Sequence, residues 1–189
     1  LEDFNRPFRY SKVTGLIDNT DNAILSNITT VTLAKLVTPT TTTSTTYTLN
    51  FNNRFFNPHS GHSTIIASTG FFINAATTEY FFDDDGQGNL RIYSLVAGVR
   101  TYFDSQAGTV DYENGIIKIN SILITSVSNV DGSASTQFRI TVLPDSNDVI
   151  PVRNQLLEID TVNTTVVGTV DQTATTGKGY TVTTTGGAG

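Results

Sequence analysis

An acidic stretch at residues 83–89, Asp-Asp-Asp-Gly-Gln-Gly-Asn, has residue types and spacing that could do chemistry. Oxygen ligands stand at the first, third and fifth positions of a calcium loop, and a glycine at the sixth: Asp83, Asp85, Gln87 and Gly88. The twelfth position, where such loops place a bidentate glutamate, is Ser94, and the flanking residues are typical of strands rather than helices. We therefore interpret the stretch as a solvated hairpin turn and predict no metal there.

Two histidines, His59 and His62, are close enough in sequence to share one metal ion. A zinc site needs three or four ligands, and no acid or third histidine is near, so we interpret both as surface-loop residues. Asp83 and Asp85 could pair as the acid and base of a glycosidase, but carboxylates at a hairpin tip are usually just solvated. No nucleophile elbow and no glycine-rich phosphate loop is found. The sequence therefore predicts no catalytic, metal-binding or cofactor-binding residue, and no enzymatic activity.

The composition limits the classes of partner. The 189 residues include 11 Lys+Arg and 17 Asp+Glu, a formal net charge of −6, and no cysteine. An acidic surface repels phosphate backbones and anionic lipid, so we expect neither nucleic acid nor membrane as a partner. No apolar run approaches the roughly 20 residues of a membrane span, and the N-terminus lacks the pattern of a signal peptide. Because it also lacks a starting Met, we expect the chain to be cut or trimmed from a longer one.

The hydrophobic pattern predicts a mainly β fold (α+β in class) with one short N-terminal helix. A helix over residues 10–18 is indicated by apolar residues at helical spacing: Tyr10, Val13, Leu16 and Ile17. The clearest strand signals are two hairpins, 79–82 with 90–93 and 108–112 with 116–119, the second turning at Asn114-Gly115. Further strands are expected at residues 28–37, 47–51, 122–127, 138–143 and 155–159. This pattern favours antiparallel sheets and hairpins in a sandwich- or barrel-like arrangement.

Three regions are expected along the chain. Residues 1–46 form a small N-terminal α+β segment, and residues 47–165 form an antiparallel β domain. Residues 166–189 are a Thr/Gly-rich tail with too few apolar side chains to order itself, so we expect it to be poorly ordered or to depend on a partner.

Aromatic doublets such as Phe55-Phe56 and Phe81-Phe82 cannot turn both rings inward on a regular strand. Successive side chains alternate between the faces of a sheet, so one ring of each doublet must lie on the other face. Either a second layer of the same chain covers that ring, or a protein partner does. Both alternatives remain open from the sequence.

Several stretches resemble a family of baseplate wedge proteins from contractile-tailed phages. The stretches are residues 8–13 (Phe-Arg-Tyr-Ser-Lys-Val), 16–21 (Leu-Ile-Asp-Asn-Thr-Asp), 24–31 (Ile-Leu-Ser-Asn-Ile-Thr-Thr-Val), 55–62, 112–115 and 147–155. The family is that of the inner-ring, baseplate-J-related subunit of T-even and cyanophage-type phages. The resemblance covers most of the chain up to about residue 165.

The resemblance implies the C-terminal portion of a wedge subunit, a non-enzymatic structural component of the tail baseplate. It implies a location in the virion, assembly in the host cytoplasm, and contacts with other copies and other baseplate proteins. We expect a dimer through residues 47–143, because Thr-rich edges lack the lysines that usually block strand pairing. The alternative is a carbohydrate- or receptor-binding β domain, with residues 83–89 beside Tyr80 and Tyr93 as its site.

Overall fold

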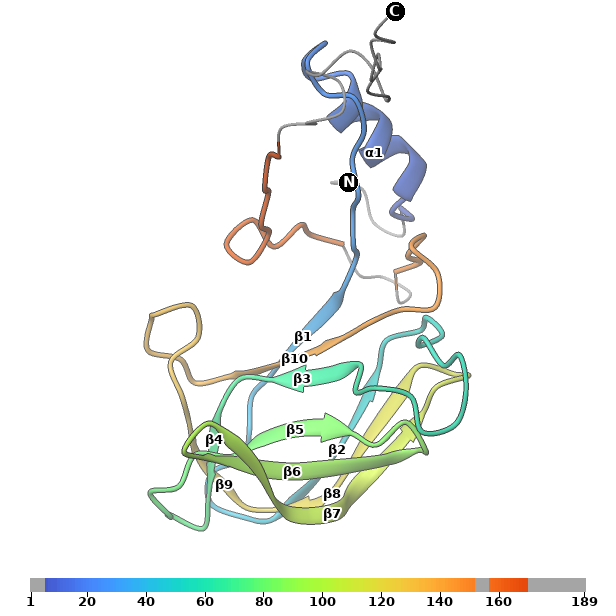
Figure 1. Cartoon of the computed structure of the whole chain (residues 1–189). Coiled ribbons are helices and arrows are strands. Elements are labelled where there is room, and N and C mark those ends of the chain that lie inside the picture. The colour runs from blue at the N-terminus through green and yellow to red at the C-terminus, as the bar shows by residue number, and fades with distance from the viewer. Residues whose placement is uncertain (1–5, 152–156, 170–189) are drawn as a thin grey trace, which may run out of the picture. The chain divides into compact units, whose positions relative to one another are not determined.

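A computed structural model describes residues 6–151 and 157–169 of the chain. Two compact units are distinguished, residues 1–158 and residues 159–189, and every helix and strand of the described residues belongs to the first (Figure 1). The prediction of a mainly β fold with antiparallel sheets and one short N-terminal helix is confirmed, and the sheets include a half-barrel. No helix in the described part of the chain is long and apolar enough to cross a membrane.

Antiparallel pairing organises the strands into three sheets (Figure 1). The largest has the order β2 (Thr45–Asn50), β8 (Ile116–Ile122), β7 (Val99–Asp111), β6 (Asn89–Val96) and β5 (Phe81–Asp84). The second has the order β1 (Leu33–Val37), β10 (Phe138–Val142) and β3 (Ile66–Ser68), and the third pairs β4 (Phe71–Ile73) with β9 (Ile124–Val127). Because β3 lies beside β5, the two larger sheets continue into one another around a shared core.

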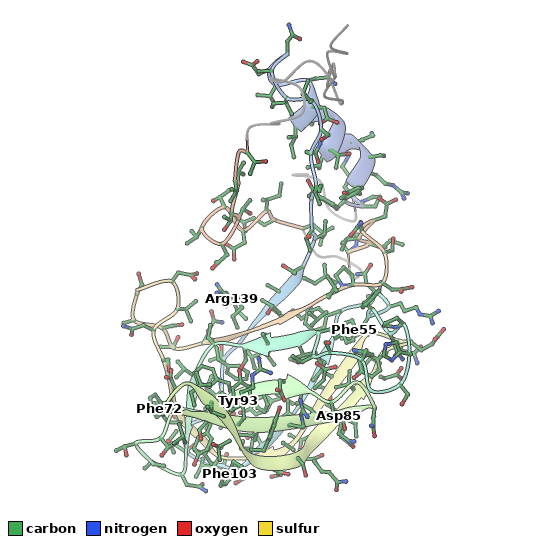
Figure 2. All side chains as sticks on the ribbon, in the orientation of Figure 1. Phe55, Phe72, Asp85, Tyr93, Phe103 and Arg139 are labelled. Atoms are coloured by element: carbon green, nitrogen blue, oxygen red, sulfur yellow. The ribbon has the colours of Figure 1, made fainter. Side chains whose placement is uncertain are left out.

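Aromatic rings form the centre of that core. Phe71 and Phe82 stack with ring centroids 4.4 Å apart, and Phe138 lies 5.9 and 6.1 Å from them. All three are fully buried, and burying such a side chain contributes about 2–3 kcal/mol each. Side chains fill the space between the curved sheets, with the buried Phe55 toward one end and Phe72 toward the other (Figure 2).

Each aromatic doublet divides between two environments, as strand alternation predicts. Phe55 is fully buried and Phe56 is 38% exposed. Phe82 is fully buried, whereas Phe81 is only partly buried and stacks on Tyr93 at 5.5 Å. The second face of β5 is therefore covered in part by an aromatic ring from the neighbouring strand β6.

Both predicted hairpins form, but the second turns differently from the expected Asn-Gly geometry. Pairing runs from Asp111 opposite Ile116, and only Gly115 of the Asn-Gly pair has a positive φ, +65°. A side chain at Gly115 would collide with the carbonyl of Asn53, so glycine is required there. The Asp111 carboxylate accepts hydrogen bonds from the backbone and side chain of Asn114, which stabilises a longer loop.

Several predicted boundaries were wrong or lie outside the described residues. The strand expected at 28–37 is restricted to β1, and Ile28 is 99% exposed. Of the strand expected at 155–159, residues 155 and 156 lie outside the described residues, and the remainder is not a strand. The long β6–β7 hairpin was not predicted. It turns at Ala97-Gly98, and both residues have a positive φ. The domain boundaries at 46 and 165 stay predictions, although β1 pairs with β10 across the first.

Helix α1 (Tyr10–Asp18) covers the predicted residues but is held by a distant carboxylate. Asp148 accepts a hydrogen bond from the Tyr10 backbone N–H at 2.9 Å and pairs with Arg9 at 2.8 Å. Phe8 and Val149 form a β-bridge beside this contact. A carboxylate at a helix N-terminus satisfies a free N–H and interacts favourably with the helix dipole. The helix itself buries no residue, and the Leu16 expected on its apolar face is 71% exposed.

The attachment of α1 should depend on the charge of Asp148. The hydrogen bonds from Arg9 and from the Tyr10 backbone lower the pKa of Asp148 below its ordinary value of 3.8. A carboxyl group whose folded pKa is depressed stabilises the structure above that ordinary value, and the contribution is lost as the pH falls through the folded pKa. We expect an NMR titration to show Asp148 titrating below 3.8 together with the Tyr10 amide. Asp148→Asn should remove the Tyr10 response, and an Asp148 pKa at or above the ordinary value would contradict the prediction.

Candidate functional site

The acidic stretch at residues 83–89 begins in strand β5 and not in a turn. Asp83 and Asp84 are the last residues of β5, and their exposed fractions are 1% and 0%. The prediction of a solvated hairpin tip was therefore wrong for these two residues. The hairpin loop proper spans residues 85–88, so only Asp85 belongs to the turn.

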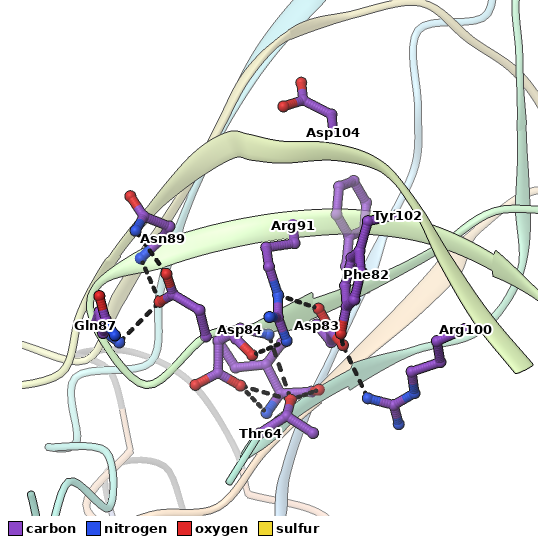
Figure 3. Close-up of polar contacts among 12 residues, drawn as sticks. Thr64, Phe82, Asp83, Asp84, Gln87, Asn89, Arg91, Arg100, Tyr102 and Asp104 are labelled. Carbon is purple, nitrogen blue, oxygen red and sulfur yellow. Dashed lines mark hydrogen bonds and ion pairs between the residues drawn. The ribbon is translucent and has the colours of Figure 1, made fainter. Parts of the chain in front are cut away.

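Asp83 lies under two guanidinium groups on one face of the sheet (Figure 3). Its carboxylate accepts hydrogen bonds from Arg91 at 2.9 Å, from Arg100 at 2.8 Å and from the Tyr102 hydroxyl at 3.1 Å. Arg91 is the cross-strand neighbour of Asp83, and Arg100 comes from β7. A buried carboxylate is tolerated only when it is paired and hydrogen-bonded in this way. Because it is inaccessible and doubly paired, Asp83 is not placed to protonate a substrate or to bind a metal.

Asp84 points to the opposite side and joins β5 to the segment that leads into β3. Its Oδ1 accepts hydrogen bonds from the Thr64 hydroxyl at 2.7 Å and from the backbone N–H groups of Ile65 and Ile66 at 2.8 and 3.0 Å. Its Oδ2 accepts the Tyr112 hydroxyl at 2.8 Å. Burial, and then the hydrogen bond and charge of Asp84, raise the pKa of Tyr112, so this phenol stays a donor. No regular backbone ladder joins β3 to β5. The Asp84 carboxylate accepts hydrogen bonds from the Ile65 and Ile66 N–H groups in place of backbone carbonyls.

Asp85 closes the hairpin loop by local hydrogen bonds. It accepts the backbone N–H groups of Gln87 and Asn89 at 2.7 and 3.0 Å, and the Asn89 side chain at 2.6 Å. Burial raises its pKa, but these hydrogen bonds and the charge of Arg91 outweigh burial and lower it overall. The carboxylates of Asp83 and Asp85 contact different partners and do not converge on one point, as a calcium loop would require. Among the described residues, no group of three or more His, Cys, Asp or Glu side chains could hold a metal ion.

The two histidines occupy different environments. His59 is exposed as predicted, but His62 is only 6% exposed and packs edge-on against Tyr112 at 5.2 Å. The prediction of two surface histidines was therefore wrong for His62. Each Nδ1 lies next to a backbone carbonyl and so donates to it: Ser60 at 3.1 Å for His59, and Ser63 at 2.7 Å for His62. His62 thus forms part of the packing around the Asp84 cluster.

The site suggested for a carbohydrate beside Tyr80 and Tyr93 is mostly closed. Tyr93 is 8% exposed, with Phe81 stacked on it and the guanidinium of Arg100 4.7 Å from its ring centroid. Tyr80 is partly buried and lies 5.0 Å from Phe103. These rings contact one another rather than presenting a shallow aromatic platform to solvent.

Exposed apolar side chains occur instead along the projecting part of the β6–β7 hairpin, on both of its faces. Four residues there are more than half exposed: Leu95 53%, Val96 59%, Val99 66% and Phe103 61%. Strand β8 pairs with β7 only at residues 108–111, so the hairpin end extends beyond its neighbour in the sheet. A group of exposed apolar residues on a projecting hairpin is typical of a protein contact surface.

Sequence reasoning missed the roles of Asp84, Thr64, Arg91 and Arg100. A signal was present in the predicted first hairpin, where Arg91 is the only cation on the strand opposite an acidic run. Opposite charges on facing strand positions indicate a cross-strand pair. Thr64 lies in the segment before β3 and Arg100 in β7, so their contributions depend on the fold and the hairpin sequence could not reveal them.

Comparison with known proteins relates the N-terminal part of the chain to a phage protein family. A family model described as baseplate structural protein gp6, C-terminal domain III, matches residues 1–36, which include α1 and nearly all of β1. No curated protein and no solved structure matches the chain. The match covers 36 of 189 residues and supports a structural protein of a phage tail baseplate, located in the virion.

Replacing Asp84 should destabilise the fold strongly. Asp84→Ala removes the acceptor of two backbone N–H groups and two hydroxyls, of which the Ile66 N–H and the Tyr112 hydroxyl are buried, and this loss costs about 3 kcal/mol or more. Asp104→Ala is the matched control, because that carboxylate is exposed on the other side of the hairpin (Figure 3) and accepts a solvent-exposed hydrogen bond from the Gln106 N–H, so its loss should cost no more than about 1 kcal/mol. Urea unfolding of both variants measures the difference. Equal stability of the two variants would contradict the role of Asp84.

Metal ions should not stabilise the chain. The Asp83 carboxylate is occupied by Arg91 and Arg100, and Asp85 is occupied by its own loop. A ligand that bound the native state would raise the melting temperature by mass action. We expect no change in Tm when millimolar calcium or zinc is added to metal-free protein. A clear concentration-dependent rise with either ion would disprove the prediction.

Proposed function

We propose that this chain is a non-enzymatic structural component of a phage tail baseplate, the C-terminal portion of a wedge subunit, and that it mediates contacts between subunits. The observation that carries the proposal is the match of residues 1–36 to a domain of a baseplate structural protein. The stretches that resemble inner-ring wedge proteins extend the likeness beyond the matched region. Assembly would take place in the host cytoplasm before the subunit is incorporated into the virion.

The candidate chemical groups support a structural role, because their contacts hold the fold together. Asp83 and Asp84 are buried and are hydrogen-bonded to residues 64–66, to strands β6 and β7 and to Tyr112. The end of the β6–β7 hairpin, by contrast, offers an exposed apolar surface of the kind that subunit contacts use. We propose this hairpin end as a contact with another baseplate protein.

Self-association is a separate part of the proposal. A ring of wedge subunits needs surfaces that match neighbouring copies, and two-fold pairing is the commonest arrangement in homo-oligomers. The acidic net charge of −6 is small for 189 residues and offers only a modest barrier to association. We propose a dimer formed through the β region between residues 47 and 143.

The location in the baseplate can be tested on purified phage particles. Gold-labelled antibodies raised against this chain should bind at the distal end of the tail in electron micrographs. Preincubation of the antibodies with the purified chain is the control and should abolish the label. Label found only on capsids, or on no particle although intact tails are present, would contradict the proposed function.

A further inference from the structure

Strand β2 forms an edge of the largest sheet and carries no charge. It follows the order β2-β8-β7-β6-β5, so it has one neighbour, β8. Its six residues, Thr-Thr-Tyr-Thr-Leu-Asn, include no Lys, Asp, Glu or Pro. Edge strands of soluble proteins are normally protected by such residues, because unpaired backbone groups attract other strands. In β2 the common protective residues are absent.

The other edges of the two large sheets are protected or carry charges. The part of β7 that extends beyond β8, residues 99–107, includes Arg100 and Asp104. The outer side of β5 is occupied by β3, through the Ser68 hydroxyl bonded to the Phe82 N–H and through the Asp84 carboxylate. Strand β1 carries Lys35 on its less exposed face, with its ammonium 5.6 Å from the Phe51 ring centroid. Burial lowers the pKa of Lys35, and a strand added beside β1 would desolvate this charge further. An inward-facing lysine is a known means of protecting an edge strand.

The backbone register identifies which groups of β2 face outward. The N–H of Phe51 donates to the carbonyl of Gly115, and the same register places Leu49 opposite Ile117. Antiparallel strands alternate between residues bonded to the neighbour and residues that point away from it. The backbone N–H and C=O groups of Thr48 and Asn50 therefore point away from β8. No strand or isolated bridge in the described part of the chain lies on that side of β2.

We propose that β2 pairs with β2 of a second copy of this chain, antiparallel across a two-fold axis, so that one continuous sheet spans both subunits. This inference rests on the self-association proposed above and assigns it to one strand. Thr48 would exchange two hydrogen bonds with Asn50 of the partner subunit, and the symmetry repeats the pair.

The sequence of β2 favours a second copy of the same strand as its pairing partner. In self-pairing each residue meets a residue of the same strand, and an uncharged strand opposes no like charges in any register. Pairing at the other unpartnered edges is disfavoured by Lys35 in β1 and by Arg100 and Asp104 in the part of β7 beyond β8, so pairing through β2 closes at two copies rather than continuing into a fibre. Tyr47 and Leu49 point toward the core and remain partly exposed, and an added strand would cover them further.

Substitutions at Thr48 test the pairing without disturbing the monomer. Its N–H points away from β8, so Thr48→Pro removes an outward donor and no bond within the sheet. Thr48→Lys places like charges close together at the two-fold axis. Ala34→Lys is the matched control, because it adds the same charge at an exposed position of the other edge strand, β1. Far-ultraviolet circular dichroism and the melting temperature establish that each variant is folded.

Light scattering across a dilution series measures the oligomeric state. We expect a dimer for the wild type and for Ala34→Lys, and at least about a tenfold rise in the dimer dissociation constant for both Thr48 variants. Dimers that persist in folded Thr48→Pro and Thr48→Lys would overturn the assignment to β2 and leave self-association standing. A wild-type chain that stays monomeric at every concentration would refute both.

Amide hydrogen exchange supplies a second readout at residue level. In the monomer the Thr48 and Asn50 amides lack a strand partner and should exchange quickly, whereas the Leu49 amide bonded to β8 is protected. Raising the protein concentration should slow exchange at Thr48 and Asn50 selectively. Concentration-dependent protection elsewhere, with none at these two residues, would exclude the proposed pairing.

Discussion

The carboxylate of Asp84 is the contact on which the junction between the two large sheets depends. Strands β3 and β5 lie side by side without a regular backbone ladder, and Asp84 receives the Ile65 and Ile66 N–H groups instead. Its second oxygen receives the Tyr112 hydroxyl, which ties the end of the β7–β8 hairpin to the same point. A buried carboxylate that accepted fewer hydrogen bonds would be unfavourable, and the buried donors among its four partners would lack an acceptor without it. By joining β3 to β5, this junction keeps the two large sheets packed around the phenylalanine core.

One acidic run thus divides into three environments. Asp83 and Asp84 alternate across strand β5, the first toward Arg91 and the second toward Thr64, while Asp85 closes the turn. Sequence reasoning placed the hairpin correctly because pattern and turn residues are local. It misjudged the acids because a charge in a strand is tolerated only when residues distant in sequence supply partners. Burial of Asp83 and Asp84 follows from the assembled sheets and could not be read from the hairpin alone.

The N-terminal helix shows the same division between local and distant causes. Apolar spacing predicted its residues, 10–18, but nothing local predicted what holds it. Its N-terminus is bound by Asp148, and Phe8 pairs with Val149. Along its length the helix is also hydrogen-bonded to Asn27 and Thr29. The helix buries none of its own side chains, and Ile28 beyond it is almost fully exposed. The region matched by the baseplate family model thus combines a helix that buries no side chain with most of β1, which pairs with β10.

The aromatic doublets bear on how copies could meet. Two explanations were open for the ring on the second face of each doublet: a layer from the same chain or a protein partner. For Phe81 the chain itself supplies much of the cover, because Tyr93 stacks on it and Arg100 lies over Tyr93. That face of β5 and β6 is consequently filled by aromatic and guanidinium groups and leaves little for a second copy to cover. The uncharged edge of the large sheet, β2, has outward backbone groups without a strand partner, and pairing there would make new hydrogen bonds rather than displace existing contacts.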